Sequence, residues 1–143
     1  MKSILMKFSV QTEQEVQLID ITEIVKDLVA NSGVTSGMAV ISTMHTTTAI
    51  TVNEGLPDLE DDLQDLLEKL VPRDGIYQHA RFLHTDGQMA VNAPSHLKGA
   101  LLGFQCIFGI EDRKLVKGLR HTIYLVELDG PQHRNLTLQI LGD

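Results

Sequence analysis

The chain of 143 residues contains one cysteine, no tryptophan and only 4% aromatic residues. Cys106 has no second cysteine to pair with, which excludes an intramolecular disulfide. With no long apolar leader near the first residues, we expect a cytoplasmic protein. The scarcity of aromatic rings argues against a surface that stacks on nucleic-acid bases. The longest uncharged stretch, residues 28–53, is interrupted by Asn, Ser, Gly, Thr and His, which argues against a membrane span.

Positive charge is also scarce, because 12 Lys and Arg stand against 19 Asp and Glu, a formal net charge of -7. Seven of the acids lie between Glu54 and Glu68, a stretch without Lys or Arg, and the rest of the chain is balanced. Six of them fall on a predicted helix over residues 57–70, opposite leucines that we expect to face inward. This local acidic block argues against a basic protein that binds nucleic acid.

The remaining composition is that of a globular protein, with 43% hydrophobic and 22% charged residues. The length fits one domain, which we expect to span residues 1–143 because no linker or internal repeat divides the chain. The spacing of apolar residues predicts an α+β fold, with a mixed or antiparallel β-sheet core and two to three helices.

The predicted strands lie at residues 4–8, 16–19, 38–41, 49–52, 104–110, 123–128 and 136–140, and the predicted helices at 21–29, 57–70 and 94–102. The segments 38–41 and 49–52 form either two strands or one long strand interrupted near His45. We expect the first two strands to form a hairpin. Asp20 followed by Glu23 resembles a capping box, and Gly33 suits the left-handed end of the first helix. Residues 73–91 are predicted to be a long loop.

Histidine is the residue type that most suggests chemistry, with six copies in the chain. Imidazole is the commonest ligand of transition metals in proteins, and a catalytic zinc site needs three protein ligands. The sequence has no HExxH or CxxC pattern, so His45, His79 or His84, and His96 can share a metal only if the fold brings them together. The alternative is that they are surface or hydrogen-bonded loop histidines.

Two segments carry groups that suit an anion. Residues 92–98 place His96 and Lys98 at the start of a predicted helix, whose free N–H groups and dipole favour a phosphate. Arg134 follows the predicted turn that begins at Asp129, and its guanidinium can clamp a phosphate or a carboxylate. The alternatives are a merely capped surface helix and an exposed hairpin arginine without such a role.

Four separated segments resemble the motifs of one family, in the same order along the chain. Residues 45–54, HTTTAITVNE, resemble HTTAAITINE; residues 77–79, YQH, resemble Y-x-H; residues 92–103, NAPSHLKGALLG, resemble N-x-x-x-H-L-K-x-x-x-x-G; and residues 123–134, IYLVELDGPQHR, resemble I-Y-L-x-E-F-D-G-P-R-x-R. On these residues the chain is identified as a member of the YjbQ-like family, which is named for secondary thiamine-phosphate synthase.

The resemblance implies a compact α+β homotrimer with a histidine pocket near a subunit boundary. It also implies weak thiamine-phosphate synthase activity, in which a pyrimidine alcohol pyrophosphate is joined to a thiazole phosphate and pyrophosphate is lost. The ligand would therefore be a small phosphorylated substrate, with neither a nucleic acid nor a membrane as partner.

The site residues that the resemblance implies fall into two groups. His45, His79 and His96 match the motif histidines and would bind a divalent metal, zinc or magnesium, with His84 as an alternative to His79. The polar motif positions are matched by Asn53, Glu54 and Arg134, which we expect to be catalytic, and by Asp129.

Three departures from the family pattern bear on substrate recognition. Residues 118–121, GLRH, stand where Gly-Thr-Trp-Gln is usual, Gln132 replaces an arginine, and the stretch after Glu54 is shortened. The leading hypothesis is a metal-assisted transferase, in which Arg134 or Lys98 holds substrate oxygens and Glu54 or a histidine moves a proton. The alternatives are a non-catalytic metabolite-binding protein and a metal-dependent phosphate-ester hydrolase.

Overall fold

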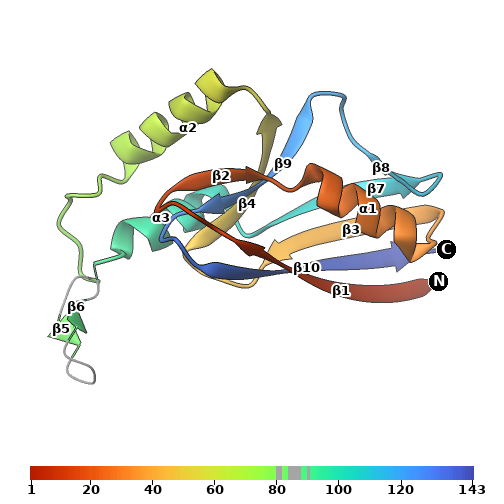
Figure 1. Cartoon of the computed structure of the whole chain (residues 1–143), viewed down its shortest axis with the longest axis horizontal. Coiled ribbons are helices and arrows are strands. Elements are labelled where there is room, and N and C mark those ends of the chain that lie inside the picture. Colours follow the sequence, from red (N-terminus) through yellow and green to blue (C-terminus); the bar gives the residue numbers. More distant parts are fainter. Residues whose placement is uncertain (80–81, 84–87, 90) are drawn as a thin grey trace.

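The residues described by the computed structural model, 1–79, 82–83, 88–89 and 91–143, form two antiparallel sheets, a short hairpin and three helices (Figure 1). The larger sheet has the order β1 (Lys2–Gln11), β10 (His133–Gly142), β3 (Ser36–Thr43), β7 (Gln105–Glu111) and β8 (Lys114–Val116). The smaller sheet has the order β2 (Gln17–Asp20), β9 (His121–Glu127) and β4 (Thr48–Glu54), and β5 (Phe82–Leu83) pairs with β6 (Gln88–Met89). The helices are α1 (Thr22–Ser32), α2 (Pro57–Leu70) and α3 (Ala93–Leu102). This architecture confirms the predicted α+β fold.

Alternating apolar side chains explain the pairing of β1 with β10. Met6 lies opposite Leu138 and Phe8 opposite Leu136, so that apolar residues of both strands face the same side of the sheet. The predicted hairpin between the first two strands is wrong, because β2 pairs with β9 in the other sheet. The polar segment 12–16 instead carries the chain from one sheet to the other.

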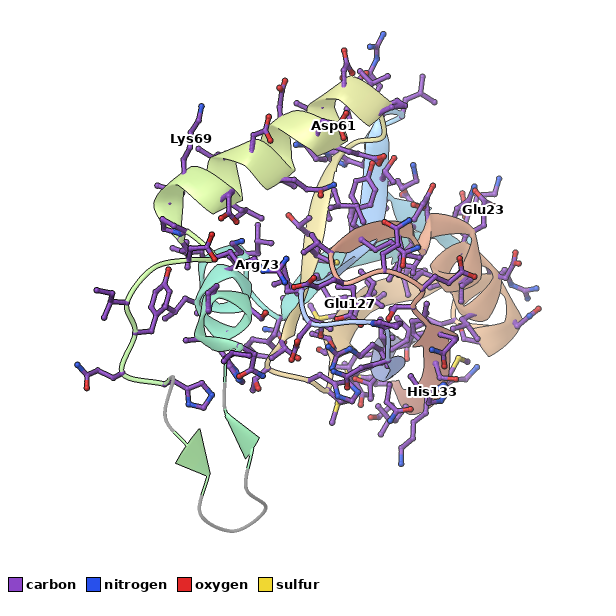
Figure 2. The ribbon with its side chains drawn as sticks, turned by 60° about the vertical axis from the view of Figure 1, so that its left-hand side comes forward. Glu23, Asp61, Lys69, Arg73, Glu127 and His133 are labelled. Carbon is purple, nitrogen blue, oxygen red and sulfur yellow. The ribbon has the colours of Figure 1, made fainter. Side chains whose placement is uncertain are left out.

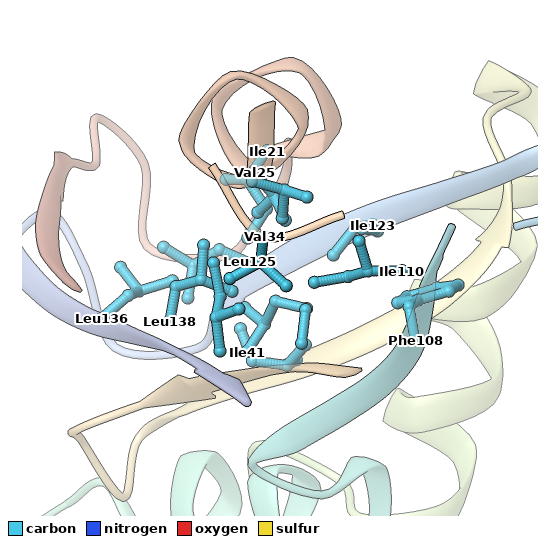
Figure 3. Packing of buried hydrophobic residues seen from close by; sticks show 14 residues of the cluster. Ile21, Val25, Val34, Ile41, Phe108, Ile110, Ile123, Leu125, Leu136 and Leu138 are labelled. Atoms are coloured by element: carbon cyan, nitrogen blue, oxygen red, sulfur yellow. The ribbon is translucent and has the colours of Figure 1, made fainter. Parts of the chain in front are cut away.

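The apolar interior lies between the sheets and beneath α1 (Figure 3). Ile41 and Leu138 come from the larger sheet and Leu125 from the smaller one, and all three are fully buried. Val25 and Val29 of α1, four residues apart, are also fully buried and close this core. Because the core fixes strands β3, β4, β9 and β10, it also fixes the connections between them, where the site residues lie.

The two ends of α1 test the sequence-based prediction of its caps. Asp20 Oδ1 accepts the N–H of Thr22 at 2.9 Å, as predicted for a first-turn N–H, but Ile21 occupies the N-cap position, so this is not the bond of a capping box. The glutamate half is wrong, since Glu23 pairs with Lys26 at 3.1 Å in the following turn. Gly33 adopts φ 76, the left-handed conformation predicted for the end of the helix.

Helix α2 stands apart from the sheets along most of its length (Figure 1). Leu67 is buried, but Leu66 and Leu70 are exposed, so the prediction of an inward leucine stripe holds for only part of the helix. Asp61 and Lys69 point outward from its far side (Figure 2), as expected for a solvated face. The exposed leucines are compatible with a further surface packing against α2.

The predicted loop 73–91 contains the two short strands β5 and β6, so it is not wholly irregular. His84, the alternative metal ligand, lies outside the described residues. None of the helices in the described part of the chain is long and apolar enough to cross a membrane.

Candidate functional site

The connection between β3 and β4 is tied to the start of β10. The Met44 N–H donates to the Asn135 carbonyl at 3.0 Å, and the Asn135 N–H donates to Nε2 of His45 at 2.9 Å. Burial, together with the nearby Arg134 guanidinium, lowers the pKa of His45 from its ordinary value of 6.5. The His45 ring is therefore held in one orientation and in its neutral form.

A buried ion pair anchors the same connection from the inside. Arg134 is 2% exposed and Glu127 is 0% exposed. Nε and Nη2 of Arg134 donate to the two carboxylate oxygens of Glu127 at 2.8 and 2.6 Å. Nη2 also donates to Oγ1 of Thr47 at 2.9 Å, and the carboxylate accepts the Thr12 hydroxyl at 2.7 Å and the Asp129 N–H at 3.1 Å. These bonds satisfy the charges that burial has removed from water.

This network gives Arg134 a different position from the one expected of a substrate clamp. Burial alone would raise the pKa of Glu127, but hydrogen bonds from Arg134 and Thr12 outweigh it and hold the pKa below its ordinary value. Figure 2 shows Glu127 in the interior, whereas His133, the residue before Arg134, lies at the surface. The guanidinium of Arg134 holds β9, β10 and the loop before β4 together, and its one charged partner, Glu127, is buried in the interior.

Helix α3 and the segment before it bring two of the predicted histidines together. The rings of His79 and His96 lie 5.1 Å apart, centroid to centroid, with their planes at 88°. Both rings line a cavity of about 410 Å³ that also includes Tyr77 and Leu97.

His96 also lines a second, larger cavity of about 710 Å³. That cavity lies between α3 and the β3–β4 connection, and its walls include Met44, His45, Thr46, Ala100 and Phe104. Its size is that of a small-molecule site, and its mixture of apolar walls with a few polar groups is typical of one. His96 is therefore the residue shared by two neighbouring cavities, with His79 on one side and His45 on the other.

The close approach of α3 to the start of β4 depends on a glycine. A Cβ on Gly99 would lie 3.2 Å from the carbonyl oxygens of both Thr46 and Thr48. The helix can thus lie against the strand at this point, which sets the width of the larger cavity.

In the part of the chain that the structure describes, the three histidines do not come together as ligands of one metal ion. Within the described residues, no group of three His, Cys, Asp or Glu side chains is placed to hold a metal ion. Nε2 of His45 accepts the Asn135 N–H, so the neutral ring carries its proton on Nδ1 and has no free lone pair for a metal. His79 and His96 are close to each other, but His45 does not fit as a third ligand.

The predicted anion site at the start of α3 contains cations that are already paired. Lys98 Nζ lies 2.7 Å from Glu68, and Arg73 lies 2.8 Å from Glu15, all four beside a cavity of about 420 Å³. Asp129 adds another carboxylate to its walls. The two cations beside the helix start are therefore neutralised by carboxylates, and Asp129 leaves an excess of negative charge, which is unfavourable for a phosphate.

Asn53 and Glu54 lie at the opposite end of β4 from His45. The strand runs from Thr48 to Glu54, and six steps of about 3.3 Å separate its ends by about 20 Å. There Glu54 pairs with Arg120 at 2.7 Å. The structure therefore does not bring Asn53 and Glu54 to the histidines within one chain.

The role of Glu127, and of the residues that contact it, was not predicted from the sequence. A signal was present, because Glu127 stands between Val126 and Leu128 at the end of a mostly apolar run that begins at Ile123. A charge at such a position requires a buried partner. The hydroxyl partners Thr12 and Thr47 gave no comparable signal, since threonine is an ordinary residue in strands and turns.

Comparisons with known proteins place this fold and these residues in a family. A family model described as "UPF0047 protein YjbQ-like" matches residues 6–143. A UPF0047 protein of Archaeoglobus fulgidus is 35% identical over 136 residues, which are 95% of this chain and 100% of that protein. The UPF0047 protein YugU of Bacillus subtilis is 31% identical over 93% of this chain and 96% of its own. The crystal structure of a YbjQ-like protein of unknown function from Sulfolobus solfataricus is similar with a TM-score of 0.90 and 32% identity, covering 99% of each chain.

Arg134 and Arg120 offer a matched test of what each ion pair contributes. Replacement of Arg134 by Met leaves the Glu127 carboxylate buried and unpaired, and we expect a loss of about 3–5 kcal/mol in the free energy of unfolding. Arg120→Met removes the exposed pair with Glu54, in which Arg120 is 80% exposed, and we expect a loss of about 1 kcal/mol or less. Urea unfolding measures both. Equal losses for the two variants would contradict the structural role given to Arg134.

The pKa of His45, which burial and the nearby Arg134 guanidinium lower, predicts a dependence of stability on pH. Because the pKa of His45 is lowered in the folded chain, the unfolded chain binds a proton more readily below about pH 6.5. The contribution of His45 to stability is therefore full above that pH and is lost as the pH falls further. We expect the Tm to fall less between about pH 7.5 and about pH 5.5 in His45→Gln, whose amide oxygen still accepts the N–H but does not titrate. An unchanged pH profile in the variant would refute this.

Proposed function

Because the chain belongs to the UPF0047 YjbQ-like family, we propose that it is an enzyme with weak thiamine-phosphate synthase activity on small phosphorylated substrates. In this transfer the ring nitrogen of the thiazole phosphate attacks the methylene carbon of the pyrimidine pyrophosphate. The bond from that carbon to oxygen breaks, and its electron pair leaves with pyrophosphate. The four matching motifs support the reaction, and the cavities beside His96 support a small-molecule ligand.

The observation that carries the proposal is the position of His96 between two cavities. A ligand in the larger cavity contacts the apolar side chains of Met44 and Phe104 and reaches the rings of His45 and His96. A ligand that extends into the smaller cavity reaches His79 as well. The reaction joins two molecules, the pyrimidine pyrophosphate and the thiazole phosphate, and two adjoining cavities offer a place for each of them.

The resemblance to the family predicts a divalent metal, zinc or magnesium. His79 and His96 offer imidazoles within 5.1 Å of each other, but the hydrogen bond to Nε2 of His45 leaves that ring without a lone pair to offer. The side chains that line the two cavities therefore bind the substrate themselves.

A second candidate function, non-catalytic metabolite binding, is favoured by one specific observation. Arg134 and Lys98, the two cations expected to hold phosphate oxygens, are each engaged with a carboxylate, Glu127 and Glu68 respectively. A binder of an uncharged metabolite needs neither cation. The two functions differ in turnover, which a binder does not perform.

Growth of a thiamine auxotroph that lacks thiamine-phosphate synthase tests the proposal. Overexpression of this chain is expected to restore growth, and His96→Ala to abolish it, because the substitution removes the one imidazole that lines both cavities. His133→Ala is the matched control, because that exposed histidine lines neither histidine cavity, and it should restore growth as well as the unchanged chain does. If the protein is folded and abundant but growth is not restored, the transferase proposal is refuted and non-catalytic metabolite binding is favoured.

We further propose that the chain forms a homotrimer through the outer face of the larger sheet. Leu5, Val40 and Ile107 lie in one row across that sheet, with Gln139 between the first two. Leu5 and Ile107 are exposed, as are Met38 and Val116 of the next row. An apolar strip of this kind on a sheet face is typical of a surface that another chain covers. That the assembly has three subunits is what the resemblance to the YjbQ-like family implies.

Sedimentation of the purified protein checks the assembly. We expect the unchanged chain to sediment as a trimer and Ile107→Lys to sediment as a monomer, because the ammonium would be buried without a partner. Leu119→Lys is the control, since Leu119 is almost fully exposed and lies outside the larger sheet. A monomeric unchanged chain would refute the proposal.

A further inference from the structure

Three side chains form a hydrogen-bonded series that ends at His79. Nε2 of His79 lies 3.1 Å from Oδ1 of Asn92, and Nδ2 of Asn92 donates to Oδ2 of Asp129 at 2.9 Å. An ionised carboxylate only accepts hydrogen bonds, so the atom of Asn92 that faces Asp129 is the amide nitrogen. The amide oxygen therefore faces His79, and Nε2 of that ring must carry a proton in order to donate. The neutral ring then has its free lone pair on Nδ1.

Asp129 is itself held by the buried network. Its N–H donates to Glu127 at 3.1 Å, and its carbonyl accepts the side-chain amide of Gln132 at 2.7 Å. The orientation of Asn92, and through it of His79, is thus set by a residue anchored to the ion pair in the interior. A histidine oriented in this way by a fixed acceptor is what a general base requires.

His45 is fixed in the opposite form. The Asn135 N–H donates to its Nε2 at 2.9 Å, so Nε2 carries the lone pair and Nδ1 carries the proton. The main-chain N–H cannot reverse its role, since it has no lone pair to offer. His45 therefore presents a donor where His79 presents an acceptor.

We infer that Asn92 and Asp129 are positioning residues that make Nδ1 of His79 a proton acceptor, while His45 donates a hydrogen bond from Nδ1. The site would then select a small molecule that carries an O–H or N–H group together with an oxygen or nitrogen acceptor. This goes beyond the proposed transfer, in which the attacking ring nitrogen carries no proton.

The two tautomers, His79 protonated at Nε2 and His45 protonated at Nδ1, determine where each proton goes. His79 accepts a proton from the O–H or N–H group at Nδ1, and the electron pair of the broken bond stays on the ligand oxygen or nitrogen. The resulting imidazolium keeps its bond to Asn92, and the Asp129 carboxylate behind it offsets the positive charge without taking the proton. His45 donates a hydrogen bond to the ligand acceptor and keeps its own proton, because its loss would leave an imidazolate.

Nitrogen-15 spectra of the ligand-free protein test the assignment. At about pH 8, where imidazoles are neutral, two-bond correlations report which ring nitrogen carries the proton. We expect His79 to be protonated at Nε2 and His45 at Nδ1, each in a single form. Peaks are assigned by substituting one histidine at a time. Protonation of His79 at Nδ1, or of His45 at Nε2, would overturn the inference.

Asp129→Asn tests the positioning role without a change of shape. An amide at position 129 can donate or accept, so Asn92 is free to turn over and His79 should become a mixture of both forms, while His45 keeps its single form. Asp74→Asn is the matched control, since Asp74 lines the same 420 Å³ cavity as Asp129 but has no bond to Asn92, and it should leave both rings unchanged. A single unchanged form of His79 in Asp129→Asn would refute the role of Asp129. No substrate is used, so the result is independent of the growth test of the proposed transfer.

Discussion

The ion pair of Glu127 with Arg134 is the interaction on which the site region depends. Two opposite charges are removed almost completely from water, which is costly unless every lone pair and proton finds a partner. Those partners come from four places in the sequence: the ends of β9 and β10, the segment after β1 and the loop before β4. The requirement to satisfy one buried pair thus draws four segments to a single point and fixes their relative positions.

The histidines acquire their orientations from the same point. His45 lies in the β3–β4 connection, which Arg134 holds through Thr47, and its ring accepts the main-chain N–H of the residue directly after Arg134. His79 is oriented through Asn92 by Asp129, whose N–H is bound to Glu127. Two rings from distant parts of the sequence therefore share one rigid support. A rigid support behind the groups that contact a ligand is what a precise binding or catalytic site needs.

Sequence patterns predicted what is local and missed what depends on pairing across the chain. The alternation of β1 and β10 and the spacing of α1 identified those elements, because each apolar face is visible in a short window. The hairpin prediction for β2 was wrong because neighbours in sequence need not be neighbours in a sheet, and the choice of β9 depends on the folding of the whole core. Arg134 looked like an exposed turn residue because its partner Glu127 is seven residues away on another strand. The same limit hid the separation of Glu54 from His45, since a motif that is continuous in sequence spans the length of β4.

The departures from the family pattern affect the two ends of β4 differently. Arg120 pairs with Glu54 at the end remote from the histidines, so that change alters the surface and leaves the cavities beside His96 untouched. Gln132 is different, because its side-chain amide donates to the carbonyl of Asp129 and its N–H donates to Thr12, which also contacts Glu127. An arginine at that position would bring a positive charge next to Asp129, where this chain has a neutral amide. The carboxylate is then left to orient Asn92, and the loss of that arginine is compatible with an intact histidine site.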